Sequence, residues 1–129
     1  YGKILDTLRR MKERGVLLVP GTDLGGSFNF HRELELFGQL GYTPAEVLKL
    51  ATHDMAKYLG QDQSTGSIAR GKLADFFLVP GDPTRDLREI KRIRAVVKDG
   101  VVYYPAEIYP EFGIRPFVEA PRVSGAGKP

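Results

Sequence analysis

The sequence predicts an α/β fold that begins with part of a parallel sheet or barrel and continues into a smaller β-rich unit. The first observation is an amphipathic helix over residues 3–14, which leads through Gly15 into the apolar run VLLV at residues 16–19. Strands that follow a helix in this way are typical of βαβ units, and uninterrupted apolar strands are usually buried on both faces. The second observation is Asp99-Gly100 between two runs rich in β-branched residues, which predicts a hairpin.

Three helices are predicted from apolar residues that recur at helical spacing. Their apolar faces comprise Ile4, Leu8 and Met11 in helix 3–14, Leu34, Phe37 and Leu40 in helix 31–40, and Val47, Leu48, Ala51, Met55 and Leu59 in the last helix. A glycine ends each helix, at positions 15, 41 and 60, where a left-handed residue is favoured. Thr43-Pro44-Ala45-Glu46 is a capping signal that starts the last helix.

The pattern changes after residue 61, where short pieces punctuated by glycine replace the helices. The predicted elements of this part are strand 74–79, a polar turn near 85–89, and strands 93–98 and 101–104. The chain therefore divides into residues 1–61, a helix–strand–helix unit, residues 62–104, a β-rich unit, and residues 105–129, an extended tail. Within the tail, residues 124–129 are predicted to be disordered or to form a lid.

Composition excludes several classes of function. The chain contains no cysteine, so disulfides and thiolate metal sites are ruled out. No apolar run approaches the roughly 20 residues that cross a bilayer, and the N-terminus has no signal-peptide pattern. The net charge of +3 is dispersed among acidic residues and is not interleaved with aromatic ones. We therefore expect neither a membrane nor a nucleic acid as a partner, and localisation stays open.

Asp23 is the first candidate for a functional residue. The apolar run 16–19 breaks at Pro20-Gly21 and is followed at once by this carboxylate. Side chains at the carboxyl ends of parallel barrel strands commonly carry the chemistry of the site. The glycine pair Gly25-Gly26 in the loop beyond it would let backbone approach a ligand, although it lacks the rest of a phosphate-binding motif. The alternative interpretation is that Asp23 merely caps the turn.

Nearby histidines and carboxylates have ordinary structural interpretations as well. His31 could share a metal with Asp23, but two ligands do not define a site, and a histidine at a helix start more often packs locally. His53 lies inside a helix on its less apolar side and is interpreted as a surface or interhelical residue. Glu33 is interpreted as a first-turn carboxylate favoured by the helix dipole rather than as a base.

Five motifs stand in a fixed order along the chain: G-T-D at 21–23, H-R-E-L at 31–34, T-P-x-E-x-L-x-x-A-T at 43–52, G-x-I-x-x-G-x-x-A-D at 66–75 and V-x-x-G-x-V at 97–102. In this order they resemble the C-terminal part of a metal-dependent amidohydrolase, in the imidazolonepropionase-like and dipeptidase-like branch of the amidohydrolase superfamily. The resemblance covers about residues 1–104. No single motif carries it; the ordered set does.

This resemblance implies the C-terminal end of a (β/α)₈ TIM barrel, followed by part of a small composite β-sandwich. It implies a hydrolase that cleaves C–N bonds in a small amide, cyclic amide or dipeptide, with Zn²⁺ or a similar divalent ion activating water. Asp23 then matches the aspartate that binds the metal and accepts a proton from the attacking water. Gly25, Gly26 and His31 are the candidates for the substrate pocket.

The chain departs from the family in lacking the other metal ligands. The H-x-H of the first strand, the bridging lysine and the two histidines of the middle strands have no counterpart, and neither His31 nor His53 matches them. No initiator Met precedes Tyr1, so we expect a fragment that is inactive alone, or one that works with the missing barrel strands or a complementary chain, and that can self-associate. The alternative is a non-catalytic module that binds a protein partner through exposed sheet edges.

Overall fold

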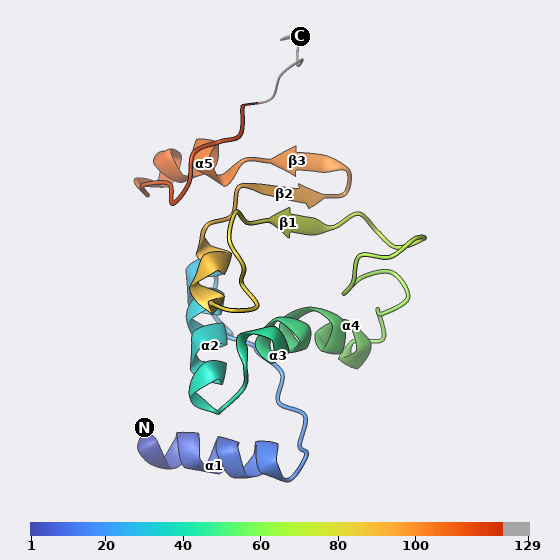
Figure 1. Cartoon of the computed structure of the whole chain (residues 1–129), viewed down its shortest axis with the longest axis vertical. Coiled ribbons are helices and arrows are strands. Elements are labelled where there is room, and N and C mark those ends of the chain that lie inside the picture. Colours follow the sequence, from blue (N-terminus) through green and yellow to red (C-terminus); the bar gives the residue numbers. More distant parts are fainter. Residues whose placement is uncertain (123–129) are drawn as a thin grey trace.

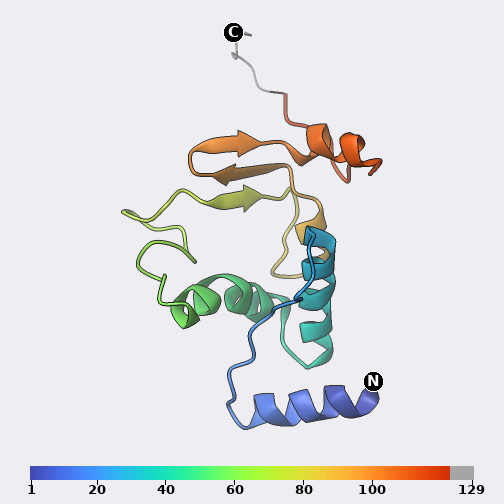
Figure 2. The same ribbon diagram turned by 180° about the vertical axis from the view of Figure 1, so that it is seen from behind.

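The computed structural model describes residues 1–122, apart from the side chain of Ser27, and arranges the elements in tiers (Figure 1). Helix α1 (Gly2–Glu13) lies at one end, α2 (Ser27–Gln39) stands in the middle, and an antiparallel sheet lies at the other end; the reverse view in Figure 2 shows the same order. The remaining elements are α3 (Pro44–Lys49), the π-helical turn η1 (Leu50–Asp54), α4 (Met55–Tyr58), β1 (Phe76–Leu78), the 3-10 turn η2 (Leu87–Lys91), β2 (Ala95–Lys98), β3 (Val101–Tyr103), α5 (Pro105–Ile108) and the 3-10 turn η3 (Tyr109–Phe112).

The core lies where α2 meets α3 and η2. Its buried members are Leu34, Phe37, Val47, Leu50, Leu87 and Ile90. The predicted apolar face of α2 is confirmed, because Leu34, Phe37 and Leu40 are all buried. By contrast, α1 buries no residue fully: Leu8 and Met11 of its apolar stripe are half-buried, and Ile4 is 62% exposed.

The start of the third helix is confirmed in detail. The hydroxyl of Thr43 accepts a hydrogen bond from the Glu46 amide at 3.3 Å, and the Thr43 amide donates to the Glu46 carboxylate at 2.7 Å. This reciprocal capping box satisfies two amides that a helix start leaves unpaired. The Thr43 amide and, at 2.9 Å, the Thr43 hydroxyl both donate to the Glu46 carboxylate, and these two bonds hold its pKa below the usual value. The helix ends before Gly60, whose φ of 68° provides the left-handed stop.

The interior of that helix differs from the prediction. A π-helical turn, η1, separates α3 from α4, so the residues after Asp54 are rotated relative to a regular helix. Ala56 is buried in consequence, whereas Leu59, which was predicted to lie on the apolar face, is 58% exposed. The prediction for Leu59 is wrong because spacing along the sequence assumes one uniform helical period.

The sheet has the order β1-β2-β3, and both of its ladders are antiparallel. Asp99 and Gly100 have φ angles of 51° and 76°, the left-handed pair that a two-residue hairpin requires, so the predicted turn is confirmed. Asp75 stabilises the turn. Its carboxylate accepts a hydrogen bond from the Asp99 amide at 3.1 Å and forms an ion pair with Lys98 at 2.7 Å. These bonds hold the pKa of the Asp75 carboxyl below its ordinary value, with Lys98 as the larger cause.

The strand predicted at residues 16–19 does not form. The segment is extended but belongs to no ladder, and Val16 and Leu17 are 44% and 54% exposed. A strand needs neighbouring strands for its amides and carbonyls, and the only sheet in residues 1–122 lies beyond α2 (Figure 1). Of this run, Leu18 packs against the core. The apolar pattern is therefore present without the partners that would make it a strand.

The C-terminal part also differs from the prediction at its start. The extended tail predicted for residues 105–129 begins instead with α5 and η3, because Pro105 occupies the first position of a helical turn. Residues 124–129, predicted to be disordered or a lid, lie outside the described residues. The division at residues 61 and 104 stays a prediction. No helix within residues 1–122 is long and apolar enough to cross a membrane.

Candidate functional site

Asp23 lies in the loop that joins the extended segment 16–22 to α2. Its side chain is exposed, and among the side chains that the structure describes no hydrogen bond or ion pair engages its carboxylate. Its φ of 51° lies in the left-handed region, which aspartate tolerates better than most residues. Such conformations persist where the surroundings impose them, and they concentrate at functional positions. The loop therefore presents a carboxylate with no other partner in this part of the chain.

Two side chains of α2 hold the loop on either side of Asp23. Glu33 accepts a hydrogen bond from the Gly21 amide at 2.7 Å, and the Asn29 amide group donates to the Gly25 carbonyl at 2.9 Å. Asn29 and Glu33 are four residues apart, so they share one face of the helix. Between them, the Thr22 hydroxyl donates to the Leu24 carbonyl at 2.9 Å and closes the turn. The position of Asp23 is thus set by α2.

This role of Glu33 was missed by the sequence interpretation. The helix was predicted to begin near residue 31, which would place Glu33 in its first turn, but α2 begins at Ser27. Glu33 is therefore beyond the reach of the helix-start dipole and acts through its bond to Gly21. The i, i+4 spacing of Asn29 and Glu33 was the available signal, since it places two polar groups over the preceding loop.

The pocket candidates fall in two different environments. Gly25 and Gly26 are exposed in the loop, and Gly26, with a φ of 99°, caps the start of α2. His31 is only 7% exposed, lies edge-on to Phe28 with ring centroids 6.1 Å apart, and has no hydrogen-bond partner for Nδ1. Burial lowers the pKa of His31, Lys91 lowers it further, and Glu35 partly offsets both. No described bond joins His31 to Asp23, so both roles stay predictions.

The described residues do not form a complete metal site. Residues 1–122 contain no group of three or more His, Asp or Glu side chains arranged to hold a metal ion. His53 lies in η1, where its Nδ1 is 3.0 Å from the Asp54 carboxylate rather than near Asp23. The exposed carboxylate of Asp23 suits a hard divalent cation, which prefers oxygen ligands. Asp23 therefore fits such an ion as one member of a larger ligand set.

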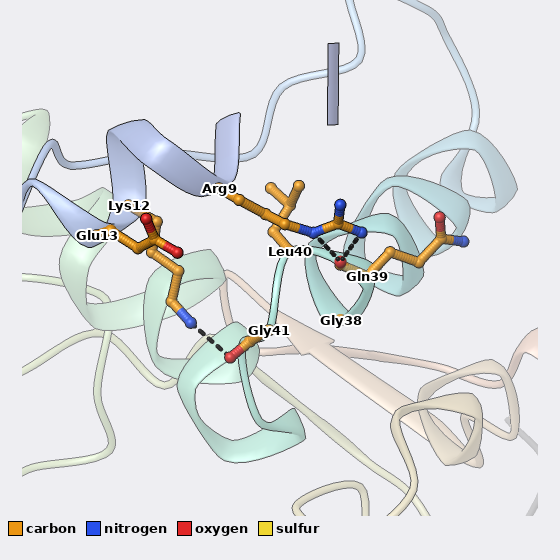
Figure 3. Close-up of a pocket in the computed structure, with 7 residues that line it drawn as sticks. All are labelled: Arg9, Lys12, Glu13, Gly38, Gln39, Leu40 and Gly41. Atoms are coloured by element: carbon orange, nitrogen blue, oxygen red, sulfur yellow. Dashed lines mark hydrogen bonds between the residues drawn. The ribbon is translucent and has the colours of Figure 1, made fainter. Parts of the chain in front are cut away.

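Two hollows on the surface of the described residues lie away from Asp23. One, of about 540 Å³, separates α1 from the end of α2; there Arg9 donates to the Gln39 carbonyl at 3.2 and 3.0 Å, and Lys12 donates to the Gly41 carbonyl (Figure 3). The C-terminal end of α2 carries the negative end of the helix dipole and has no basic residue in its own last turn. Arg9 and Lys12 supply positive charge there and link α1 to α2. The other, of about 610 Å³, is an apolar seam between η1–α4 and the sheet.

The bond from Gly21 to Glu33 leads to a testable expectation. In Glu33→Ala the Gly21 amide loses its acceptor, so its hydrogen exchange is expected to accelerate by on the order of ten-fold. Glu33→Gln retains a side-chain oxygen at the same place and should exchange at nearly the wild-type rate. Amide exchange followed by NMR measures both variants. Equal exchange at Gly21 in Glu33→Ala and the wild type would contradict the anchoring role.

Comparison with known proteins gives a consistent result. The model of the amidohydrolase family matches residues 2–103. No curated protein matches the chain. Among solved structures, a Xaa-Pro dipeptidase with methionine bound in its active site is 33% identical, with a TM-score of 0.72 over 78% of this chain. A proposed prolidase from Bifidobacterium longum is 36% identical, with a TM-score of 0.70 over 77% of this chain.

The likeness covers only part of those proteins. The chain spans 25% of the dipeptidase and 26% of the proposed prolidase. A third solved structure, an amidohydrolase that is 31% identical with a TM-score of 0.68, is covered to 25% as well. The chain therefore matches about a quarter of each of these structures.

Proposed function

This chain belongs to the amidohydrolase family, and on that premise we propose that it forms the C-terminal portion of a metal-dependent hydrolase of C–N bonds. The observation that carries the proposal is Asp23: an exposed carboxylate in the left-handed region, held on both sides by α2 and inside the stretch that matches the family. If Asp23 only capped the turn, its carboxylate would accept a hydrogen bond from a neighbouring backbone amide. Among the described residues, the Thr22 hydroxyl bonds within the turn and the Asp23 carboxylate makes no such bond.

In the proposed chemistry Asp23 has two tasks. One oxygen of its carboxylate contributes to holding a divalent cation, and the other accepts a proton from the attacking water. When bound, the cation would acidify water and polarise the amide carbonyl. The water oxygen forms the new bond to the carbonyl carbon, the C–N bond breaks, and the proton held by Asp23 passes to the departing nitrogen. The products are a carboxylic acid and an amine.

The substrate is proposed to be a small amide, with dipeptides as the first class to test. Two of the similar solved structures are named as a Xaa-Pro dipeptidase and a proposed prolidase, both of which are peptide hydrolases by name. We propose that the exposed backbone at Gly25 and Gly26 lines the mouth of the pocket, with His31 behind it. Cyclic amides are the second class.

The remaining ligands are proposed to come from barrel strands outside this chain, or from a complementary chain. Residues 1–122 contain no complete metal-binding group, and the apolar side chains of Ile4, Val16 and Leu17 are exposed. Activity is therefore assigned to the assembled protein. The chain alone is expected to be inactive and prone to self-association through its open apolar faces.

The test uses the protein from the complete reading frame that encodes this chain. We expect it to hydrolyse dipeptides, Xaa-Pro substrates among them, after loading with Zn²⁺ or another divalent metal, and to lose activity to a chelator and regain it with metal. Chromatography of the released amino acids and elemental analysis of the protein measure both effects. The isolated 129-residue chain serves as the control. Failure of the loaded protein to hydrolyse any dipeptide or cyclic amide would defeat the proposal.

The open sheet edges favour one other candidate function. Both β1 and β3 are edge strands, and their exposed side chains include Phe77, Leu78, Val101, Val102 and Tyr103. Edges of this kind can pair with a strand of another protein. Under this alternative the chain is a binding module without catalysis, and the hydrolysis test above separates it from the enzyme.

A further inference from the structure

The C-terminal segment folds back on itself after the sheet. After β3, the turns α5 and η3 run to Gly113, whose φ of 68° reverses the chain, and the Ile114 amide donates to the Tyr109 carbonyl at 3.0 Å. This reversal brings Phe117 edge-on to Tyr109, with ring centroids 6.2 Å apart. The segment lies beyond residue 103, where the match to the family ends.

The rings of Tyr109 and Phe117 both contact the ring of Phe28. The ring of Phe28 is 6.0 Å from that of Tyr109 and 5.9 Å from that of Phe117, and its third aromatic neighbour is His31. Figure 2 shows the orange-red segment next to the end of α2 that follows the pale blue loop. Burial of the Tyr109 hydroxyl raises its pKa, which agrees with a packed ring. Phe28 is thus held from outside its own helix.

Phe28 contacts these aromatic rings and follows closely in sequence on the loop that carries Asp23. It belongs to the first turn of α2, two residues after Gly26 and one before Asn29, whose side chain holds the Gly25 carbonyl. The helix start has no acidic residue in its first turn, and Gly26 provides no side-chain cap. Local capping therefore does little to order this end of α2. This end of α2 is held by the bond from Asn29 to Gly25, by Phe30 against the core, and by the rings around Phe28, which is 36% exposed.

We propose that residues 105–118, here called the C-terminal clamp, position the Asp23 loop by holding Phe28. This inference rests on the function proposed for Asp23, but its physical claim concerns only the order of the loop. When the clamp is intact, Asn29 and Glu33 stay in register with Gly25 and Gly21. When it is released, the first turn of α2 frays, and the carboxylate loses its fixed direction. The residues of the clamp are positioning residues, since none touches the reacting atoms.

The experiment measures hydrogen exchange by mass spectrometry in the complete protein. In Phe117→Ala, peptides covering residues 30–33 are expected to exchange about ten-fold faster, because two ring pairs are lost and these amides donate to the carbonyls of the first turn of α2. Peptides of α3 should not change. The conservative Phe117→Tyr keeps the ring and should behave as the wild type. The matched control is Phe112→Ala in the same segment, a side chain that is 73% exposed and belongs to none of these ring pairs.

Steady-state kinetics adds a readout that simple loosening of the fold would not produce. In Phe117→Ala we expect kcat to fall several-fold with KM little changed, since the loop positions the proton acceptor rather than the substrate. Unchanged exchange at residues 30–33 would overturn the inference whether or not the protein is an enzyme. If Phe117→Ala raises exchange throughout, Phe117→Leu, which preserves most of the apolar volume, decides: a local rise supports the clamp, and a general rise or none overturns it. An inactive wild-type protein with a local rise would refute the proposed function alone.

Discussion

Replacement of Asp23 by Asn is expected to reduce hydrolysis by the complete, metal-loaded protein by about 10²–10⁴-fold, the usual contribution of a positioned proton acceptor. Asn has nearly the same shape and tolerates the left-handed φ of 51° that this position requires. It cannot accept the proton as a carboxylate does, and its neutral amide is a poorer ligand for a divalent cation. Initial rates with a saturating dipeptide measure the effect, and elemental analysis of the purified variant measures the accompanying loss of metal.

A matched control exists in the same chain. Asp99 has the same φ of 51°, is exposed, and lies in the hairpin turn rather than in the loop before α2. Asp99→Asn therefore makes an identical chemical change at a position with the same φ. It removes one solvent-exposed ion pair with Lys98, which contributes little to stability, and should leave the rate unaltered. Wild-type rates in Asp23→Asn, or equal losses in both variants, would exclude the role of Asp23.

The choice of Asn over Ala matters for the interpretation. Asp23→Ala would place an ordinary L-residue in the left-handed region at a cost of about 1–2 kcal/mol. A loss of activity in that variant could then reflect a displaced loop as much as a missing carboxylate. With Asn, unchanged exchange at Gly21 would show that the bond to Glu33 persists. The chemical and the conformational effects are thereby separated.

Elements with local signals could be predicted from the sequence. The reciprocal bonds of Thr43 and Glu46 involve residues three apart, and the Asp99-Gly100 turn needs two adjacent left-handed residues. Both depend on chemistry that a short window contains. The buried face of α2 likewise follows from spacing alone, because one regular helix carries Leu34 and Phe37 and is capped by Leu40.

Elements that depend on distant partners could not be predicted. The run 16–19 has the composition of a buried strand, yet strand formation requires hydrogen-bonding neighbours that residues 1–122 do not supply. The π-helical turn at Leu50–Asp54 breaks the period on which the burial of Leu59 was predicted. At the candidate site, Asp23 was found from its place after an apolar run. Its anchors were not, since the bond from Gly21 to Glu33 spans 12 residues.

The structure gives a physical reason for glycine at each of positions 66 and 71, and the two reasons differ. Both residues have positive φ, 80° at Gly66 and 89° at Gly71. A Cβ on Gly71 would meet nothing within 4 Å, whereas a Cβ on Gly66 would lie 2.4 Å from the Cβ of Ala56 and 3.1 Å from the Thr52 carbonyl oxygen. Glycine is thus favoured at position 66 for two reasons: its positive φ and its close approach to η1 and α4.

Gly66→Ala is accordingly expected to destabilise the protein by about 2–5 kcal/mol, the sum of left-handed strain and of overpacking against atoms that cannot move away. Gly71→Ala suffers only the strain and should cost about 1–2 kcal/mol. Urea unfolding followed by circular dichroism compares the two variants at equal protein concentration. A Gly66→Ala midpoint no lower than that of Gly71→Ala would show that the chain is not packed against η1 and α4 at this point.

A double-mutant cycle tests the contact itself. Ala56→Gly removes the methyl group that the new side chain would strike, at a cost of about 1 kcal/mol for glycine inside a helix. If the clash is real, Gly66→Ala combined with Ala56→Gly will be less destabilised than the sum of the single variants, by about 1–3 kcal/mol. Additive effects would mean that the two residues are not in contact. A favourable coupling would show that Gly66, at the start of the segment 66–75, packs directly against Ala56 of α4. This contact would link residues 1–61 to the β-rich unit of residues 62–104.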